Sequence, residues 1–326
     1  MSIKLYSNES TKALIRSLIS KGREPHSIAI CGDKGQGKKA MASYIAAALL
    51  CDNGNGEPCG HCKSCRMISN GVHPDFITVK PNENGNYKVD DIRAVVADAV
   101  TKPNEGRFKV YLIPDLDRSG NTLVQVQNIL LKLIEEPPEH CVMILTAASK
   151  EVFLETVISR VLCLRTEPCT IDDSREFLKS QGYTDEQIDK AVSFGKGNIG
   201  RCVEYLEDPI FAESIRIADE CMTAVFENDE YGLAQALFAA DGKKALLRQV
   251  LLMLKEGFHD ACIIRAGAKD GADCVIPSAH KIAEKFLTNE CMDMYKEVSE
   301  HIIKLDSNAN LQLTVNSLTA KLFNDR

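Results

Sequence analysis

Four cysteines in the first quarter of the chain have the type and spacing of a metal site. The run Cys59-Gly60-His61-Cys62-Lys63-Ser64-Cys65 places two residues between successive thiols, and seven residues separate Cys51 from Cys59. Structural zinc sites take four such thiolates in a closed tetrahedron, and Gly60 permits the tight turn that would aim Cys59 and Cys62 at one ion. Ordinary buried cysteines or disulfides are the alternatives, but such thiols rarely cluster among Gly, Asn, Glu and Pro. The sequence predicts a structural zinc site at Cys51, Cys59, Cys62 and Cys65.

A second group of residues has the spacing of a phosphate-binding loop. Gly32-Asp33-Lys34-Gly35-Gln36-Gly37-Lys38-Lys39 nearly fits the pattern G-x-x-x-x-G-K-[ST] between an apolar run and an alanine-rich helical pattern. Gly32, Gly35 and Gly37 would let backbone N–H groups converge on phosphate oxygens at a helix amino terminus. Lys38 would reach the β and γ phosphates. The alternative is a flexible basic turn before a helix.

The residues that would hold magnesium in such a loop are missing. The eighth position should be Ser or Thr, but it is Lys39, whose ammonium has no lone pair to offer and would repel a divalent cation. A hydrolytic site would also end a strand with adjacent carboxylates for the metal and the water. Pro114-Asp115-Leu116-Asp117 offers no adjacent pair in either register. We therefore expect a degenerate ATPase site with no productive magnesium site and no hydrolysis of its own, although ATP or ADP could still bind.

The first half of the chain alternates short apolar runs with helical patterns, which is typical of a parallel sheet covered by helices. The predicted strands are 27–31, 76–79, 109–113, 142–146 and 161–164, and the predicted helices are 40–50, 89–100 and 121–134. This pattern predicts a doubly wound α/β domain over residues 1–166, with the zinc module inserted at about 51–72.

From Glu167 onward only helical patterns occur. Capping boxes at Thr170 and Thr184 begin two short helices. Residues 167–207 are predicted to form a small three-helix lid domain. Residues 208–326 are predicted to form an all-α domain, in which apolar helix faces make a bundle core.

Composition narrows the functional classes. The chain has 326 residues, enough for two or three domains, and its formal charge of −7 argues against a protein that coats nucleic acid by itself. No apolar run approaches the roughly 20 residues needed to cross a bilayer, and the amino terminus lacks the apolar stretch of a secretory signal. We therefore expect a cytoplasmic protein whose 13 cysteines are reduced thiols, which favours metal ligation over disulfides.

Several runs spread over most of the chain resemble one family. Besides the phosphate loop and the four cysteines, they are Gly22-Arg23-Glu24-Pro25-His26, His73-Pro74-Asp75-Phe76, Val89-Asp90-Asp91-Ile92-Arg93, Asn128-Ile129-Leu130-Leu131-Lys132-Leu133-Ile134-Glu135-Glu136-Pro137-Pro138, Ile158-Ser159-Arg160 and Gly197-Asn198-Ile199-Gly200-Arg201. Together they resemble the AAA+ clamp-loader subunits of bacterial DNA polymerase III, most closely those of the delta-prime type. The cysteine spacing and the Leu-Leu-Lys to Glu-Glu-Pro-Pro run are specific in combination.

The resemblance implies roles for three further residues. Arg160 would be an arginine finger that reaches ATP bound by a neighbouring subunit, because its planar charged fork suits a transition-state phosphate. A surface arginine paired with a nearby carboxylate is the alternative. Arg201 matches a second-sensor arginine or, with Lys39 present, is only a lid-packing residue. Thr146 matches the first-sensor position.

The resemblance also implies partners. The chain would be a non-hydrolysing subunit in a hetero-pentameric ring with gamma/tau and delta subunits, assembled through a carboxy-terminal collar. This clamp loader would place the sliding clamp on primer–template DNA, with no membrane involved. One alternative is an active gamma/tau-type ATPase, which Lys39 disfavours. The other is a zinc-ribbon nucleic-acid-binding module, for which Lys63 and Arg66 form only a thin basic patch beside the metal.

Overall fold

The structure is a computed structural model that describes residues 3–82, 86–240, 242–267, 276–307 and 309–324. Contacts within the chain divide it into two compact units. The α/β unit comprises Met1–Phe177 and Gly197–Gly200, and the helical unit comprises Leu178–Lys196 and Arg201–Arg326.

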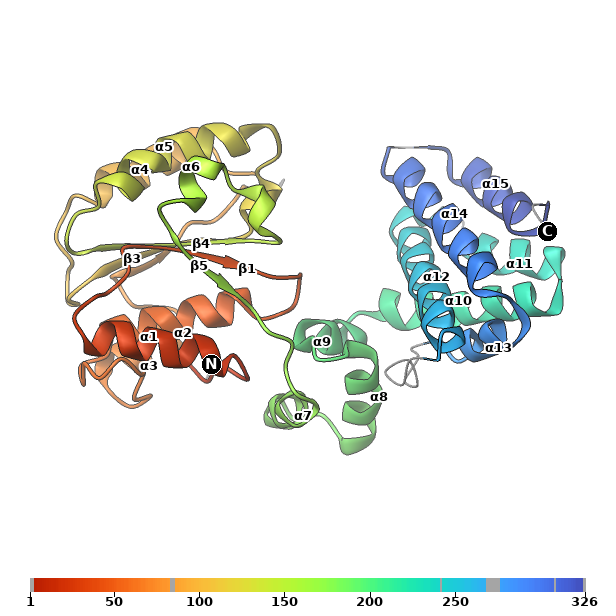
Figure 1. Cartoon of the computed structure of the whole chain (residues 1–326), viewed down its shortest axis with the longest axis horizontal. Helices are drawn as coiled ribbons and strands as arrows, with labels where there is room; N and C mark the ends of the chain where they lie inside the picture. Colours follow the sequence, from red (N-terminus) through yellow and green to blue (C-terminus); the bar gives the residue numbers. More distant parts are fainter. Residues whose placement is uncertain (1–2, 83–85, 241, 268–275, 308, 325–326) are drawn as a thin grey trace. The chain divides into compact units, whose positions relative to one another are not determined.

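A five-stranded parallel sheet forms the centre of the α/β unit (Figure 1). Its strands lie in the order β2-β3-β4-β1-β5, with the bounds β1 Ser27–Cys31, β2 Phe76–Thr78, β3 Lys109–Ile113, β4 Cys141–Ala147 and β5 Leu162–Arg165. Every neighbouring pair is parallel, so the carboxyl ends of all strands meet at one edge. In open sheets of this kind, ligands bind outside that edge where the strand order reverses.

Helices cover both faces of the sheet (Figure 1). One face carries α1 (Glu9–Ser20), α2 (Lys38–Leu50) and α3 (Lys63–Ser69), and the other carries α4 (Val89–Asp98), α5 (Leu123–Glu135) and α6 (Glu155–Ile158). Short 3-10 helices span Leu116–Thr122 and Lys150–Val152. Along β1, Ile28 and Ile30 join the core under α1 and α2, whereas Ala29 and Cys31 join the core under α4 and α5. This alternation explains why the strand is apolar at every position.

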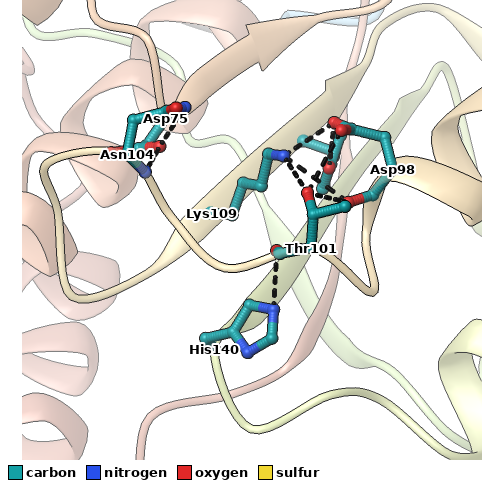
Figure 2. Close-up of polar contacts among 7 residues, drawn as sticks. Asp75, Asp98, Thr101, Asn104, Lys109 and His140 are labelled. Atoms are coloured by element: carbon teal, nitrogen blue, oxygen red, sulfur yellow. Dashed lines mark hydrogen bonds and ion pairs between the residues drawn. The ribbon is translucent and has the colours of Figure 1, made fainter.

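A polar network around the buried Lys109 fixes the start of β3 (Figure 2). The Lys109 ammonium lies 2.9 Å from a carboxylate oxygen of Asp98 and 2.8 Å from the Thr101 hydroxyl. The Tyr111 hydroxyl donates to the same Asp98 carboxylate at 2.7 Å, and His140 Nε2 lies 2.9 Å from the Thr101 carbonyl oxygen. A buried ammonium thus has both a counter-ion and hydrogen-bond acceptors, as burial of a charge requires.

Asp75 holds the loop before β3 in place (Figure 2). Its side chain is fully buried. The carboxylate accepts hydrogen bonds from the backbone N–H groups of Asn104, Glu105 and Gly106, at 2.6, 2.8 and 2.7 Å. One carboxylate therefore accepts hydrogen bonds from three consecutive backbone N–H groups that lie outside any strand or helix.

The remaining elements are all helices. They are α7 (Ile171–Ser180), α8 (Asp185–Gly195), α9 (Ile199–Glu207), α10 (Pro209–Glu227), α11 (Glu230–Phe238), α12 (Lys244–Arg265), α13 (Ser278–Lys285), α14 (Thr288–Asp306) and α15 (Leu311–Asn324). α8 begins with the capping box that was predicted at Thr184. One continuous apolar core runs through the helical unit, from Phe194 to Leu322.

The predicted fold class, a doubly wound parallel sheet followed by helices, is confirmed. α1 and α3 lie where no helix is predicted. The division at residues 166 and 207 stays a prediction. Within the described ranges, every helix is too short or too polar to cross a lipid bilayer.

Candidate functional site

The four cysteines of the predicted zinc site lie together between α2 and α3. Cys51 ends α2, Cys62 caps the amino terminus of α3, and Cys65 lies in the first turn of α3. With Cys59 from the intervening loop, their sulfur atoms all lie within 4.8 Å of one another. A tetrahedral zinc with Zn–S bonds of about 2.3 Å would space its sulfurs about 3.8 Å apart. Small rotations of the thiols would complete that geometry, so the donor set fits zinc.

Backbone N–H groups support negative charge on this cluster. The N–H of Cys62 donates to the sulfur of Cys59, and the N–H of Cys65 donates to the sulfur of Cys62, both at 3.3 Å. The N–H of His61 is the main cause that lowers the pKa of Cys59 to about 6. Burial instead raises the pKa of Cys51. The exposed side of the cluster therefore favours thiolate, and a bound cation would supply the charge that the buried side lacks.

The phosphate loop runs from the carboxyl end of β1 to the first residue of α2. Gly35 and Gly37 have φ values of 88° and 78°, which explains why both positions are glycine. Gly37 is the N-cap of α2, so the first N–H groups of this helix point out of its amino terminus with no intrahelical acceptor. Lys38 is only 8% exposed, and its ammonium donates to the carbonyl oxygens of Gly32 at 2.6 Å and Asp33 at 3.1 Å.

Asn198 and Gly200, which were not predicted as site residues, donate hydrogen bonds to the phosphate loop. The Asn198 side-chain amide donates to the Lys34 carbonyl oxygen at 2.8 Å, and the Gly200 N–H donates to the Gly35 carbonyl oxygen at 3.0 Å. A Cβ on Gly200 would lie 2.3 Å from the Gly35 Cα, so only glycine fits at this close approach. In the sequence, these residues belong to the run Gly197-Asn198-Ile199-Gly200, which carries part of the family resemblance.

Lys39, Asp115 and Thr146 meet at the carboxyl edge of the sheet. The Lys39 ammonium lies 3.3 Å from a carboxylate oxygen of Asp115. Asp115 follows β3 with a left-handed φ of 50°, and its backbone N–H donates to the Thr146 hydroxyl at 2.8 Å. The Asp117 carboxylate makes a different contact: it accepts a hydrogen bond from the Ala148 backbone N–H at 3.1 Å. An ammonium thus occupies the place beside Asp115 where a magnesium ligand would be needed, and these residues do not fit a divalent cation.

Arg160 lies away from the phosphate loop. It lies two residues before β5, in which Leu162 pairs with Ile28 near the start of β1 and Arg165 pairs with Cys31 at its end. Since the loop begins after Cys31 and each residue of a strand advances about 3.3 Å, Arg160 belongs to the opposite edge of the sheet. Its side chain is 43% exposed and lies 3.1 Å from a carboxylate oxygen of Glu135. It cannot serve the phosphate loop of its own chain.

Arg201 has two contacts inside the helical unit. Its guanidinium lies 2.5 Å from a carboxylate oxygen of Glu256 and stacks over the Phe194 ring at 4.8 Å from the ring centre. Of the residues predicted from the sequence, the structure brings together the four cysteines, places Lys38 against Gly32, and places Lys39 and Thr146 on either side of Asp115.

Comparison with known proteins shows the family. A family model described as DNA polymerase III, delta subunit, matches residues 7–170, which is half of the chain. The DNA polymerase III gamma subunit of Buchnera aphidicola (subsp. Acyrthosiphon pisum) is 29% identical over 240 residues, covering 70% of this chain and 65% of that protein. The delta' subunit of Bacillus subtilis is 29% identical over 201 residues, covering 62% and 60%.

One solved structure is similar over most of the chain. A DNA polymerase III gamma subunit-related protein of Thermotoga maritima has a TM-score of 0.47 and 15% identity, with 96% of this chain and 99% of that chain covered. The chain spans less than two thirds of the length of the curated relatives described above. The resemblance to clamp-loader subunits is confirmed by the match over residues 7–170. This chain belongs to the family of DNA polymerase III delta subunits.

Proposed function

We propose that this chain is a non-hydrolysing, delta-prime-type subunit of a DNA polymerase III clamp loader. It would act in a cytoplasmic hetero-pentameric ring with gamma/tau and delta subunits, which loads the sliding clamp onto primer–template DNA. The relatives named above as gamma and delta' subunits support membership of such an assembly. Collar formation by residues 208–326 is part of the proposal.

The contact between Lys39 and Asp115 carries the proposal. At 3.3 Å, the ammonium neutralises the carboxylate that would otherwise be available to a metal. Metal-assisted phosphoryl transfer needs the dication to neutralise charge that develops on the phosphates. A site that replaces the metal ligand by a cation therefore loses hydrolysis while the surrounding fold remains intact.

The position of Arg160 supports its role as a finger in trans. A guanidinium at the amino edge of the sheet is remote from its own loop but available to a neighbour. Its ion pair with Glu135 is solvent-exposed, and such pairs are worth only about 0–1 kcal/mol. Its two further hydrogen bonds, to the Thr156 carbonyl oxygen and the Ser159 hydroxyl, are also exposed, so water or a phosphate can replace these partners.

The other residues have supporting roles in this proposal. The cysteine cluster would hold one structural zinc, which ties the end of α2 to the start of α3. Thr146 would hold Asp115 in its left-handed conformation through the backbone N–H. Arg201 would act as a packing residue, which its contacts with Glu256 and Phe194 support.

Reconstitution tests the proposal. The chain is mixed with gamma/tau and delta subunits, and clamp-stimulated ATP turnover is compared for wild type, Arg160→Ala and Arg93→Ala. Arg93 is the matched control because it is also an exposed arginine with one surface carboxylate partner, Asp90. Arg160→Ala should remove turnover at the site that receives the finger, whereas Arg93→Ala should not change it. Equal turnover in all three proteins would show that the finger role is wrong.

An active gamma/tau-type ATPase is the second candidate. Two relatives favour it: the Buchnera aphidicola gamma subunit at 29% identity and the Escherichia coli tau subunit at 25%. The identity to the Bacillus subtilis delta' subunit is also 29%. Magnesium-dependent ATP turnover by the chain alone separates this candidate from the first.

A further inference from the structure

A polar cavity of about 540 Å³ lies in the α/β unit, at the amino edge of the sheet and therefore opposite the phosphate loop. Three segments line it, and each one comes directly before a strand: 22–26 before β1, 107–108 before β3 and 139–140 before β4. These strands are neighbours in the sheet and run parallel, so their amino ends meet at one edge. Cavities that hold small molecules measure about 300–1,000 Å³, so this one is large enough for a ligand.

Arg107 is held in a defined orientation at this cavity. Its guanidinium lies 2.8 Å from Oε1 of Glu24 on one side, and its central carbon lies 4.9 Å from the centre of the Phe108 ring on the other. The Glu24 side chain is only 8% exposed, so the anchor itself is fixed. A guanidinium has five N–H donors, and a single carboxylate contact leaves most of them for a ligand. Because Arg107 is already ordered, it loses little side-chain entropy when it binds an anionic group.

The Glu24 carboxylate lacks a hydrogen-bond donor. Its contact with Arg107 is close enough for an ion pair, yet Oε1 is a buried atom with no hydrogen-bond partner among the residues that the structure describes. A buried acceptor that has lost water without gaining a donor is destabilising, and a charged one more so. A ligand that brings an N–H group to Glu24 would remove this penalty.

Two further side chains of opposite charge line the cavity without pairing. Arg23 and Glu139 are both exposed, and neither has an ion-pair partner within the described ranges. With Arg107 and Glu24, they give the cavity two guanidinium groups and two carboxylates, which sum to a formal charge of zero. A ligand with one anionic and one cationic group is complementary to such a lining. An anion alone would leave Glu24 without its donor, and a cation alone would oppose both arginines.

His26 and His140 add two hydrogen-bonding groups. His26 Nδ1 lies 3.1 Å from the Cys141 carbonyl oxygen, and His140 Nε2 lies 2.9 Å from the Thr101 carbonyl oxygen (Figure 2). A carbonyl oxygen can only accept, so these two nitrogens carry the protons, and the second nitrogen of each neutral ring is left as an acceptor. The described part of the chain gathers three or more metal-ligating groups only at the four cysteines, so this cavity is not built for a metal.

We propose that this cavity binds a small zwitterion of the amino-acid or dipeptide class. The carboxylate of the ligand contacts the guanidinium groups of Arg23 and Arg107, which suit planar carboxylates. Its ammonium contacts the carboxylates of Glu24 and Glu139 and supplies the donor that Glu24 Oε1 lacks. The site lies at the opposite edge of the sheet from the phosphate loop, and its occupancy is a property beyond the clamp-loader role proposed above.

Ligand-observed NMR with the full-length chain tests the proposal. Saturation transfer and titration are measured for alanine, alanylalanine, N-acetyl-alanylalanine and alanylalanine amide. At least one of the two zwitterions, alanine or alanylalanine, should bind. The acetylated dipeptide lacks the ammonium and the amide lacks the carboxylate, so each should bind at least about tenfold more weakly than the zwitterion. Tighter binding of alanine or of alanylalanine identifies the amino acid or the dipeptide as the class, and either result supports the site.

Variants at the exposed positions locate the binding. Arg23→Gln and Glu139→Gln should each weaken binding of the zwitterion at least about fivefold, and neither should disturb the fold, since both side chains are exposed. Arg93→Gln is the matched control, because Arg93 is an exposed arginine outside the cavity. Absence of binding by both zwitterions, equal or tighter binding of the acetylated dipeptide, or wild-type affinity in Arg23→Gln and Glu139→Gln would overturn the proposal. None of these readouts involves ATP turnover, so the proposed function is tested separately.

Discussion

Replacing Asp75 by asparagine should unfold the loop before β3. Each carboxylate oxygen accepts two hydrogen bonds: Oδ1 from the backbone N–H and side-chain amide of Asn104, and Oδ2 from the N–H groups of Glu105 and Gly106. An amide keeps one oxygen and presents an NH₂ group to the donors at the other. Whichever way it turns, two donors lose their acceptor, at about 1–3 kcal/mol each. We expect a total loss of about 2–6 kcal/mol.

Hydrogen exchange measured by mass spectrometry is the appropriate assay, since it reports the α/β unit separately from the helical unit. Asp75→Asn should reduce protection of peptides that cover residues 104–113 and leave those of α12 and α14 unchanged. Asp90→Asn is the control, because it alters an exposed carboxylate with one surface partner and should change stability by less than about 0.5 kcal/mol. Equal protection in Asp75→Asn and wild type would refute the reasoning.

The Asp75 carboxylate also makes the stability of the α/β unit depend on pH. Burial by itself would raise the pKa of Asp75, but the N–H groups of Asn104, Gly106 and Glu105 outweigh it and hold the pKa below its usual value. A pKa that is depressed in the folded state contributes stability above the unfolded value of about 3.9, and this contribution is lost as the pH falls below it. Asp75→Asn should lack this part of the acid sensitivity, and the control should retain it.

Three further predictions concern other parts of the molecule. Elemental analysis should find about one zinc per chain, and Cys62→Ser should lower the zinc content; a zinc-free wild type with an intact fold would contradict the assignment. Lys109→Met should cost about 1–3 kcal/mol by removing charge-assisted hydrogen bonds to Asp98, whose half-exposed carboxylate water would then solvate, measured as a fall in the denaturation midpoint of the α/β unit, and an unchanged midpoint would refute this. Arg160→Ala should reduce a neighbour's ATP turnover by up to about 10³-fold at the receiving site, with Arg93→Ala as the reference.

Local patterns were sufficient to predict the sheet. All five strands lie within one or two residues of their predicted bounds because each is a short apolar run between turn residues. α1 lies where no helix is predicted, although its buried positions Thr11, Ile15 and Ile19 recur every four residues. α3 has only seven residues and is capped by a cysteine, so periodicity gives almost no signal there.

The candidate site was predicted in part. Close spacing along the chain was enough to expect the cysteine cluster and the loop from Gly32 to Lys39, since the residues of each lie within one or two short elements. Contacts between distant segments could not be foreseen from spacing. The pairing of Lys39 with Asp115, 76 positions later, depends on the strand order of the sheet. The support that Gly200 gives to Gly35 likewise depends on tertiary packing.

The central claim is that an ammonium has replaced the metal ligand, and phosphate release by the purified chain tests it most directly. Release is measured from ATP with excess magnesium, for wild type beside Lys38→Ala, so that a contaminating ATPase would appear equally in both preparations. The account predicts the same background rate in the two proteins. Magnesium-dependent release by the wild type that Lys38→Ala abolishes would contradict it.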